Sequence, residues 1–151
     1  MIKPQTGMLQ NGVFYFPVRV YYEDTDSQGF VYYANYLKFA SRARTEFLRY
    51  LGFDVEVGKG KDRAVFVARH LEIDYKNSGF FGDALEVSCE IEKLGHSSLI
   101  LKQCVTREGT LLAQIKITLV MINVLSHKPV RIEETLRNRL LSLLKTSEPF
   151  N

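Results

Sequence analysis

Apolar and polar residues alternate along several stretches of the chain, the pattern of strands with one buried face. The clearest stretch is residues 85–92, where four apolar residues alternate with three glutamates and a serine. Residues 113–121 repeat the alternation, and residues 14–23, 64–75 and 98–106 also read as strands. The links at residues 93–96 and 107–110 are short, so they predict antiparallel hairpins. We therefore expect a sheet of about five strands.

Between residues 34 and 51 the apolar spacing changes to three and four residues, the period of an amphipathic helix. The apolar face of this helix consists of Tyr36, Ala40, Ala43, Phe47 and Leu51. Gly52 ends the pattern, as a helix C-terminus commonly does. Such a helix would be about 27 Å long. A shorter helix is predicted over residues 133–144.

The order of the elements predicts an α+β fold with the long helix packed on one face of an antiparallel sheet, plus a short C-terminal helix. Because no repeat or low-complexity stretch interrupts the chain, we treat residues 1–151 as one domain with its core at about residues 12–145. The last strand is apolar on both faces near residues 119–122. A subunit interface is one way to cover its second face.

Composition excludes several classes of protein. The chain has 20 basic and 17 acidic residues without a Lys/Arg cluster, so no nucleic-acid partner is expected. Apolar runs such as residues 119–122 are far too short to span a membrane. Residues 1–13 do not have the pattern of a signal peptide. Cys89 and Cys104 are interpreted as small buried hydrophobes, so a cytoplasmic location is expected.

Residues 21–36 hold the most informative chemistry of the chain. This segment contains Glu23, Asp24 and Asp26, one glycine and five tyrosines immediately before the long helix. The start of a helix offers unpaired N–H groups and the positive end of the helix dipole, which together stabilise an oxyanion. A carboxylate nearby can act as a nucleophile or a general base. The same residues also suit a plain turn with a helix cap, and spacing does not decide between the two readings.

The segment V-R-V-Y-Y-E-D-T-D-S-Q-G-F-V-Y-Y-A-N-Y-L-K-F-A-S-R-A-R-T-E-F-L resembles hot-dog-fold thioesterases of the 4-hydroxybenzoyl-CoA type. More narrowly, it resembles the acyl-CoA thioesterases associated with the Tol-Pal envelope system. The resemblance covers about residues 14–134 and is strongest in D-x-x-G-x-V-Y-x-x-x-Y, which runs straight into the predicted helix. It implies a hot-dog fold, in which an antiparallel sheet wraps a long helix.

By this resemblance, Asp26 is the catalytic carboxylate, as nucleophile or as general base. The backbone N–H of Tyr33, in the first helical turn, polarises the thioester carbonyl. Gly29 allows a tight turn beneath the thioester because it adopts a positive φ without strain. Tyr36 is a candidate for the acyl pocket. The Tol-Pal group usually has histidine where this chain has Tyr33, so the backbone donor is kept but an imidazole is lost.

Coenzyme A needs cations for its phosphates and a slot for its pantetheine arm. Lys93 and Ser97 flank a predicted hairpin and are candidates, with Arg69 as a third. Each is equally well interpreted as a solvated surface residue. Arg42 and Glu46, one helical turn apart, are interpreted as a surface ion pair.

Other chemistry of the same fold is not favoured by these residues. Hydratases of the fold carry D-x-x-x-x-H, but Val31 stands five residues after Asp26. The three histidines, His70, His96 and His127, have no metal-ligand spacing, so no metal is expected.

We therefore predict an acyl-CoA thioesterase without a cofactor, coenzyme A being part of its substrate. The resemblance implies a dimer or a homotetramer of hot dogs with sites at the subunit interfaces. The alternative is a non-catalytic acyl-binding or scaffolding protein for acyl carrier protein and phospholipid-synthesis enzymes. Asp26 and Gly29 favour the enzyme, because a scaffold has no need of that carboxylate.

Overall fold

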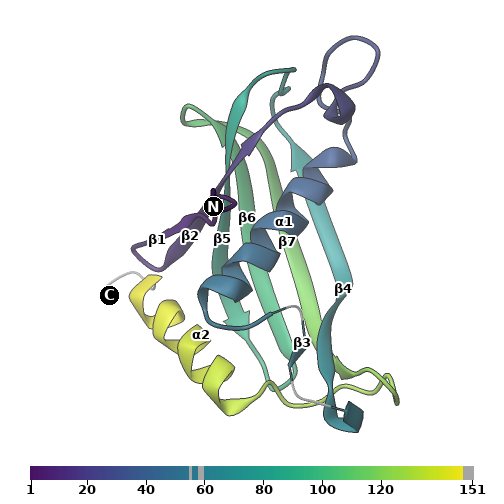
Figure 1. Ribbon diagram of the computed structural model, residues 1–151, viewed down its shortest axis with the longest axis vertical. Helices are drawn as coiled ribbons and strands as arrows, with labels where there is room; N and C mark the ends of the chain where they lie inside the picture. The colour runs from purple at the N-terminus through teal and green to yellow at the C-terminus, as the bar shows by residue number, and fades with distance from the viewer. Residues whose placement is uncertain (55, 58–59, 148–151) are drawn as a thin grey trace.

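The computed structural model describes residues 1–54, 56–57 and 60–147. Seven strands of this part form one sheet in the order β1-β2-β5-β6-β7-β4-β3, and every neighbouring pair is antiparallel (Figure 1). The strands are β1 Met8–Gln10, β2 Val13–Arg19, β3 Glu56–Val57, β4 Ala64–Tyr75, β5 Ala84–Leu94, β6 Ser98–Arg107 and β7 Thr110–Asn123.

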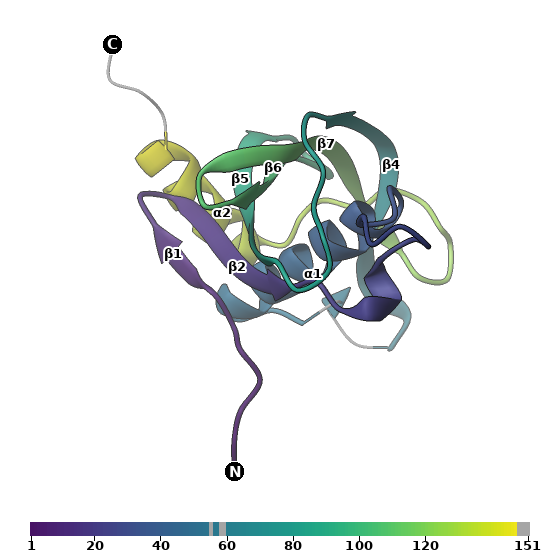
Figure 2. The ribbon, with the colours of Figure 1, turned by 90° about the horizontal axis from the view of Figure 1, so that it is seen from above.

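Helix α1 (Asn35–Tyr50) lies across one face of the sheet, and the view from above shows the sheet curling around it (Figure 2). All five residues of its predicted apolar face are buried, Ala40, Ala43 and Phe47 completely, and Phe39, which the predicted face does not include, is completely inaccessible as well. The small side chains of Ala40 and Ala43 allow the helix axis to approach the strands closely. Burial of this stripe, rather than helix propensity alone, accounts for the position of α1.

Helix α2 (Glu134–Ser147) packs beside the C-terminal end of α1, at the lower end of the molecule in Figure 1. Leu136 and Leu140 are fully buried. Arg139 donates a hydrogen bond to the carbonyl oxygen of Leu51, just after α1. Arg137 donates to the carbonyl oxygens of Gly95 and His96 at 2.7 Å, so α2 also holds the β5–β6 link.

The predicted α+β architecture is confirmed, with two differences in the strands. β1 and β3 were not predicted, because three and two residues are too few to show a period of two. The first predicted strand, residues 14–23, ends at Arg19. Beyond it, Tyr22–Asp24 form a 3-10 turn.

The apolar end of β7 is buried within the chain itself, so a subunit interface, one way that the sequence offers to cover it, is not needed there. Leu119, Val120 and Met121 are all buried. The segment after β7 folds back onto the strand: Val130 N–H donates to the Met121 carbonyl at 2.9 Å, and Pro129 lies opposite Ile122.

A long unpaired edge of the sheet lies on β4. β3 pairs only with Ala64 and Val65, so among the described residues the rest of β4, as far as Tyr75, has no neighbour on its outer side. An edge of this length presents unpaired backbone groups to which another strand can add.

Neither cysteine forms a disulfide. Cys89 is completely buried, as predicted, and Cys104 is half-buried. Burial raises the pKa of the Cys89 thiol to about 12, so this group stays protonated at neutral pH.

Among the described residues, no helix is both long and apolar enough to cross a bilayer.

Candidate active site

The loop between β2 and α1 is closed at its base by Asp24. This side chain is 2% exposed. One carboxylate oxygen accepts the N–H of Tyr21 at 2.8 Å, and the other accepts the side-chain amide of Asn35 at 3.0 Å. The Asp24 carbonyl also accepts the N–H of Tyr32 at 2.9 Å. Asp24 therefore joins the two ends of the loop to the start of α1.

Residues 76–83 support the tip of the same loop. Val31 N–H donates to the Gly79 carbonyl at 2.9 Å, and Phe81 N–H donates to the Gly29 carbonyl at 3.0 Å. The supporting segment is fastened to the sheet by Arg107, the last residue of β6. Its guanidinium contacts Asp83 at 2.8 Å and the Ser78 carbonyl at 3.0 Å. The loop thus rests on backbone that is itself anchored.

Asp26 lies exposed at the tip of this loop, in a tight turn. Its Oδ1 accepts the N–H groups of Gln28 at 2.9 Å and Phe30 at 3.2 Å. Gly29 has a φ of +84°, the left-handed conformation that the sequence predicts there. Oδ2 has no hydrogen-bond partner in the described part of the chain. One oxygen therefore orients the carboxylate, and the other is open to a substrate or a water molecule.

The sequence predicts Tyr33 in the first turn of α1. The helix begins at Asn35, so Tyr33 lies just before it instead. Its N–H has no acceptor among the described residues, whereas those of Tyr32 and Asn35 are engaged. The Tyr33 carbonyl accepts the hydroxyl of Tyr75 at 2.9 Å, which fixes the peptide. An open N–H just before a helix N-terminus is a donor suited to an oxyanion.

Three tyrosines meet in a pocket of about 300 Å³ beside this donor. The ring of Tyr75 stands edge-on to those of Tyr33 and Tyr36, with centroids 6.3 and 5.7 Å apart. Burial raises the pKa of both Tyr36 and Tyr75, so both phenols stay protonated at neutral pH. The Tyr36 hydroxyl accepts the N–H of Gly79 at 3.0 Å. Asp26 does not line this pocket; Val31, Lys76, Asn77 and Ser78 complete it.

Sequence reasoning missed Tyr75 as part of this site. The only available signal was an aromatic residue at the end of a predicted strand. Its proximity to Tyr33, 42 residues away, depends on how β4 and α1 pack.

The three residues predicted to hold coenzyme A lie away from this loop within one chain. Lys93 is nine residues along β5 from Ala84, about 30 Å at the usual rise per residue. Ser97 lies in the β5–β6 link, which α2 holds at the lower end of the molecule. Arg69 is six residues, or about 20 Å, along β4 from Tyr75.

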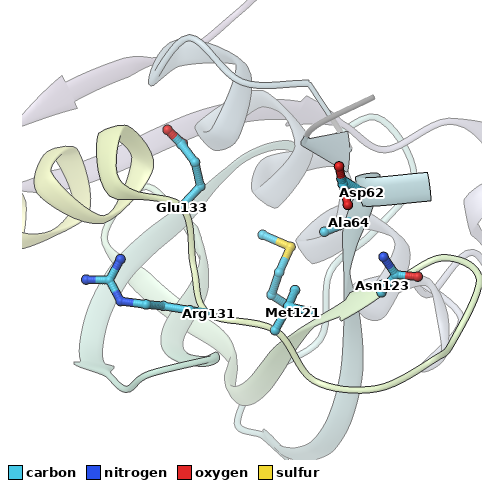
Figure 3. Close-up of a pocket in the computed structure, with 7 residues that line it drawn as sticks. Asp62, Ala64, Met121, Asn123, Arg131 and Glu133 are labelled. Carbon is cyan, nitrogen blue, oxygen red and sulfur yellow. The ribbon is translucent and has the colours of Figure 1, made fainter. Parts of the chain in front are cut away.

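A separate pocket of about 250 Å³ lies where β4 and β7 approach α2 and carries none of the predicted site residues (Figure 3). Three of its polar side chains are engaged in contacts with the surrounding chain. The Glu133 carboxylate accepts the N–H groups of Thr135 and Leu136 at the start of α2, and Arg131 pairs with Glu134 at 3.2 Å. Its Asn123 donates to the Lys61 carbonyl at 2.7 Å. These contacts are structural.

The predicted ion pair between Arg42 and Glu46 is wrong. Glu46 contacts Arg49 at 3.7 Å, and the Arg42 guanidinium lies over the ring of Phe39, 5.9 Å from its centroid. His70 pairs with Glu72 at 3.0 Å. Among the described residues no group of three potential metal ligands comes together.

Comparison with known proteins decides the family. Residues 28–114, more than half of the chain, match the sequence model of the Thioesterase superfamily. The acyl-CoA thioesterase YbgC of Haemophilus influenzae is 39% identical over 123 residues, 82% of this chain and 90% of that protein. The acyl-CoA thioester hydrolase YbgC of Escherichia coli is 40% identical, over 78% and 87% of the two chains. This chain belongs to the thioesterase superfamily.

Solved structures agree with this assignment and with the hot-dog fold. A probable thioesterase from Bartonella henselae superposes with a TM-score of 0.75 at 32% identity, over 80% of this chain and 99% of its own. A 1,4-dihydroxy-2-naphthoyl-CoA thioesterase from Synechocystis superposes with a TM-score of 0.76, over 87% and 97% of the two chains. Its 19% identity shows the shared fold alone. The resemblance seen in the sequence is thus confirmed: the chain is a thioester hydrolase of hot-dog fold.

Proposed function

We propose that this thioesterase hydrolyses acyl-CoA to the free acid and coenzyme A, at a site that contains Asp26 and the Tyr33 N–H. The observation that carries the proposal is the pair of unsatisfied groups on one loop: Oδ2 of Asp26 and the N–H before α1. Relatives that carry the name acyl-CoA thioesterase support this choice of thioester. No separate cofactor is part of the proposal.

In this mechanism the thioester carbonyl accepts a hydrogen bond from the Tyr33 N–H, beside the positive end of α1. Donors of this kind contribute about 3–4 kcal/mol to transition-state stabilisation. Asp26 acts from its free oxygen in one of two ways. As a nucleophile it forms an acyl anhydride, which water then hydrolyses; as a general base it removes a proton from the attacking water.

A single-turnover reaction in ¹⁸O-labelled water tests for the nucleophilic role. If Asp26 is the nucleophile and water attacks its carboxyl carbon, one labelled oxygen is retained in the Asp26 side chain. Label only in the released acid is the result for a general base, and also for an anhydride that water opens at the acyl carbon, so label in Asp26 is the outcome that identifies the nucleophile. Mass spectrometry of the peptide that contains Asp26 reads this difference.

We further propose that the working unit is a dimer, or a homotetramer built from dimers, in which a second copy adds to the unpaired edge of β4. The long free edge supports this arrangement. Within one chain, Arg69, Lys93 and Ser97 lie far from Asp26. In such an assembly they would contact coenzyme A bound at the Asp26 of a second copy. Acyl carrier protein in place of coenzyme A, and a cytoplasmic location, stay predictions.

The test is thiol release from a panel of acyl-CoAs, short, long and aromatic, by wild type and by Asp26→Asn. Asparagine keeps the acceptor for Gln28 and Phe30 but removes the charge. We expect wild type to hydrolyse some members of the panel and the folded variant to lose that activity. Equal activity in both proteins would contradict the role of Asp26. Binding of acyl carrier protein by an inactive wild type would favour the scaffolding alternative.

A further inference from the structure

A third pocket, of about 170 Å³, lies between α1 and β4. Four residues of one helical face line it on one side, and three residues of the sheet line it on the other. They are Ser41, Arg44, Thr45 and Leu48, facing Phe66, Ala68 and Leu119.

Arg44 is the only charged side chain of this pocket, and a neutral network holds it in place. Its Nη1 donates to Oε1 of Gln103 at 2.9 Å. Gln103 is completely buried, and its amide donates to the Ala40 carbonyl at 3.0 Å and to the sulfur of Cys89 at 3.1 Å. The guanidinium is therefore fixed in position by a partner that cannot neutralise its charge.

Some arginines of the described part pair with a carboxylate, as in Arg107–Asp83, Arg131–Glu134 and Arg49–Glu46, and others donate to backbone carbonyls, as Arg19 and Arg137 do. Arg44 has none there, and its only hydrogen bond in that part of the chain is to Gln103. Burial lowers the pKa of the Arg44 guanidinium, the direction expected for a cation without a counter-charge. A partly buried charge of this kind is costly unless an anion joins it.

We propose that this pocket binds a carboxylate on a short apolar body, its anion held by the guanidinium of Arg44. The hydroxyl of Ser41 is a second donor at the same wall, and Leu48, Phe66 and Leu119 suit the apolar part. Arg44 lies nine residues after Asn35, about 13 Å along the helix axis from the proposed catalytic centre. The carboxylate belongs either to a free acid or to the far end of an acyl group. The second source rests on the proposed function.

Calorimetric titration with hexanoate and with the neutral hexanamide tests the site without any hydrolysis. A fixed guanidinium forms charge-assisted hydrogen bonds, so hexanoate should bind wild type at least about tenfold more tightly than the amide. Equal affinity for the two compounds, or no binding of hexanoate, would overturn the proposal. Failure of the thioesterase proposal would leave this result unaffected.

Three variants locate the binding. Arg44→Met should weaken hexanoate binding at least about tenfold, whereas Arg42→Met, on the same helix but outside the pocket, should leave it unchanged. Ser41→Leu fills the pocket but keeps the bond from Arg44 to Gln103, so it should also abolish binding without loss of the fold. If Arg44→Met binds hexanoate as tightly as wild type, the assignment is contradicted. The same holds if Arg42→Met loses as much affinity as Arg44→Met.

The source of the carboxylate is read from dicarboxylic acyl-CoAs of increasing length, each compared with the monocarboxylic acyl-CoA of the same length. If the far end of the acyl group occupies the pocket, one dicarboxylic member has the higher kcat/KM, and Arg44→Met removes that preference. If a free acid is the ligand, hexanoate binds, the preference is absent, and Arg44→Met changes only hexanoate binding.

Discussion

Asp24 and Asp26 stand two residues apart in one loop but have opposite surroundings. Asp24 is buried, and both of its carboxylate oxygens accept hydrogen bonds from the two ends of the loop. Asp26 is exposed and uses one oxygen to hold its own turn, while the other has no partner in the described part of the chain. The first holds the loop, and the second keeps one oxygen open, as the proposed chemistry requires. Burial and hydrogen bonding, rather than residue type, separate the two roles.

The comparison extends to the backbone around them. Tyr32 and Asn35 use their N–H groups to close the loop and begin the helix, whereas the N–H of Tyr33 between them has no acceptor in the part of the chain that the structure describes. Because Tyr75 holds the carbonyl of Tyr33, the open donor is nevertheless fixed. Fixed donors cost little reorganisation when charge develops on a substrate, which is the condition for oxyanion stabilisation.

The largest effect is expected for Asp26→Asn. We expect kcat/KM for the best acyl-CoA to fall by at least about 100-fold, because a general base or nucleophile is removed. The free energy of unfolding should change by no more than about 0.5 kcal/mol, since the side chain is exposed. Thiol release and urea unfolding measure the two quantities. A large loss of stability would place Asp26 with Asp24 as a structural residue.

Asp24→Ala should show the opposite pattern. It leaves the Tyr21 N–H and the Asn35 amide without their acceptor, so the free energy of unfolding should fall by about 2–4 kcal/mol. Glu23→Ala, at an exposed neighbouring carboxylate, is the matched control and should change it by less than about 0.5 kcal/mol. A double-mutant cycle with Asn35→Ala should give a coupling of about 1–2 kcal/mol. An absence of coupling would mean that the observed bond is not what stabilises the loop.

Much of the fold can be predicted from local pattern. The run of apolar and β-branched residues marks β4 at its observed bounds, and the helical spacing places α1 to within a residue at each end. These elements are long enough to repeat their period several times. β1 and β3 are not, so they form through pairing with strands that already exist.

The site could be predicted only in part, for a related reason. The motif around Asp26 and Tyr33 is contiguous, so the sequence alone offers both residues as candidates. Other partners are distant in the sequence. Asp24 accepts a hydrogen bond from the side chain of Asn35, and Tyr75 contacts Tyr33 from 42 residues away. Gln103 contacts Arg44 from 59 residues away. Such partners are determined by packing between elements, which no local period encodes. At β7, apolar patterning rightly predicts that both faces are covered near residues 119–121, but it does not show that they are buried within the chain itself.

Gly29→Ala tests whether the turn of Asp26, rather than space around it, matters. A φ of +84° strains any other residue, but no heavy atom lies within 4 Å of the added Cβ. We therefore expect a loss of about 1–2 kcal/mol in unfolding free energy and lower activity as the turn relaxes. Gly109→Ala has the same φ and the same open surroundings, outside the loop. It should lose similar stability and keep full activity. If Gly29→Ala and Gly109→Ala are equally active, the conformation of the Asp26 turn is not required for catalysis.

The smallest effect is expected for Tyr75→Phe, which removes the hydroxyl that holds the Tyr33 carbonyl but leaves the ring in the pocket. The loss of one neutral hydrogen bond should lower kcat/KM by about threefold, through a less well positioned donor. Burial raises the pKa of Tyr75, so its hydroxyl remains a donor throughout the neutral range and is lost only above the ordinary value of ~10. The ratio of wild-type to variant kcat/KM should therefore stay constant between about pH 6 and 9. A ratio that changes within that range would mean that Tyr75 titrates during catalysis and does more than position the peptide.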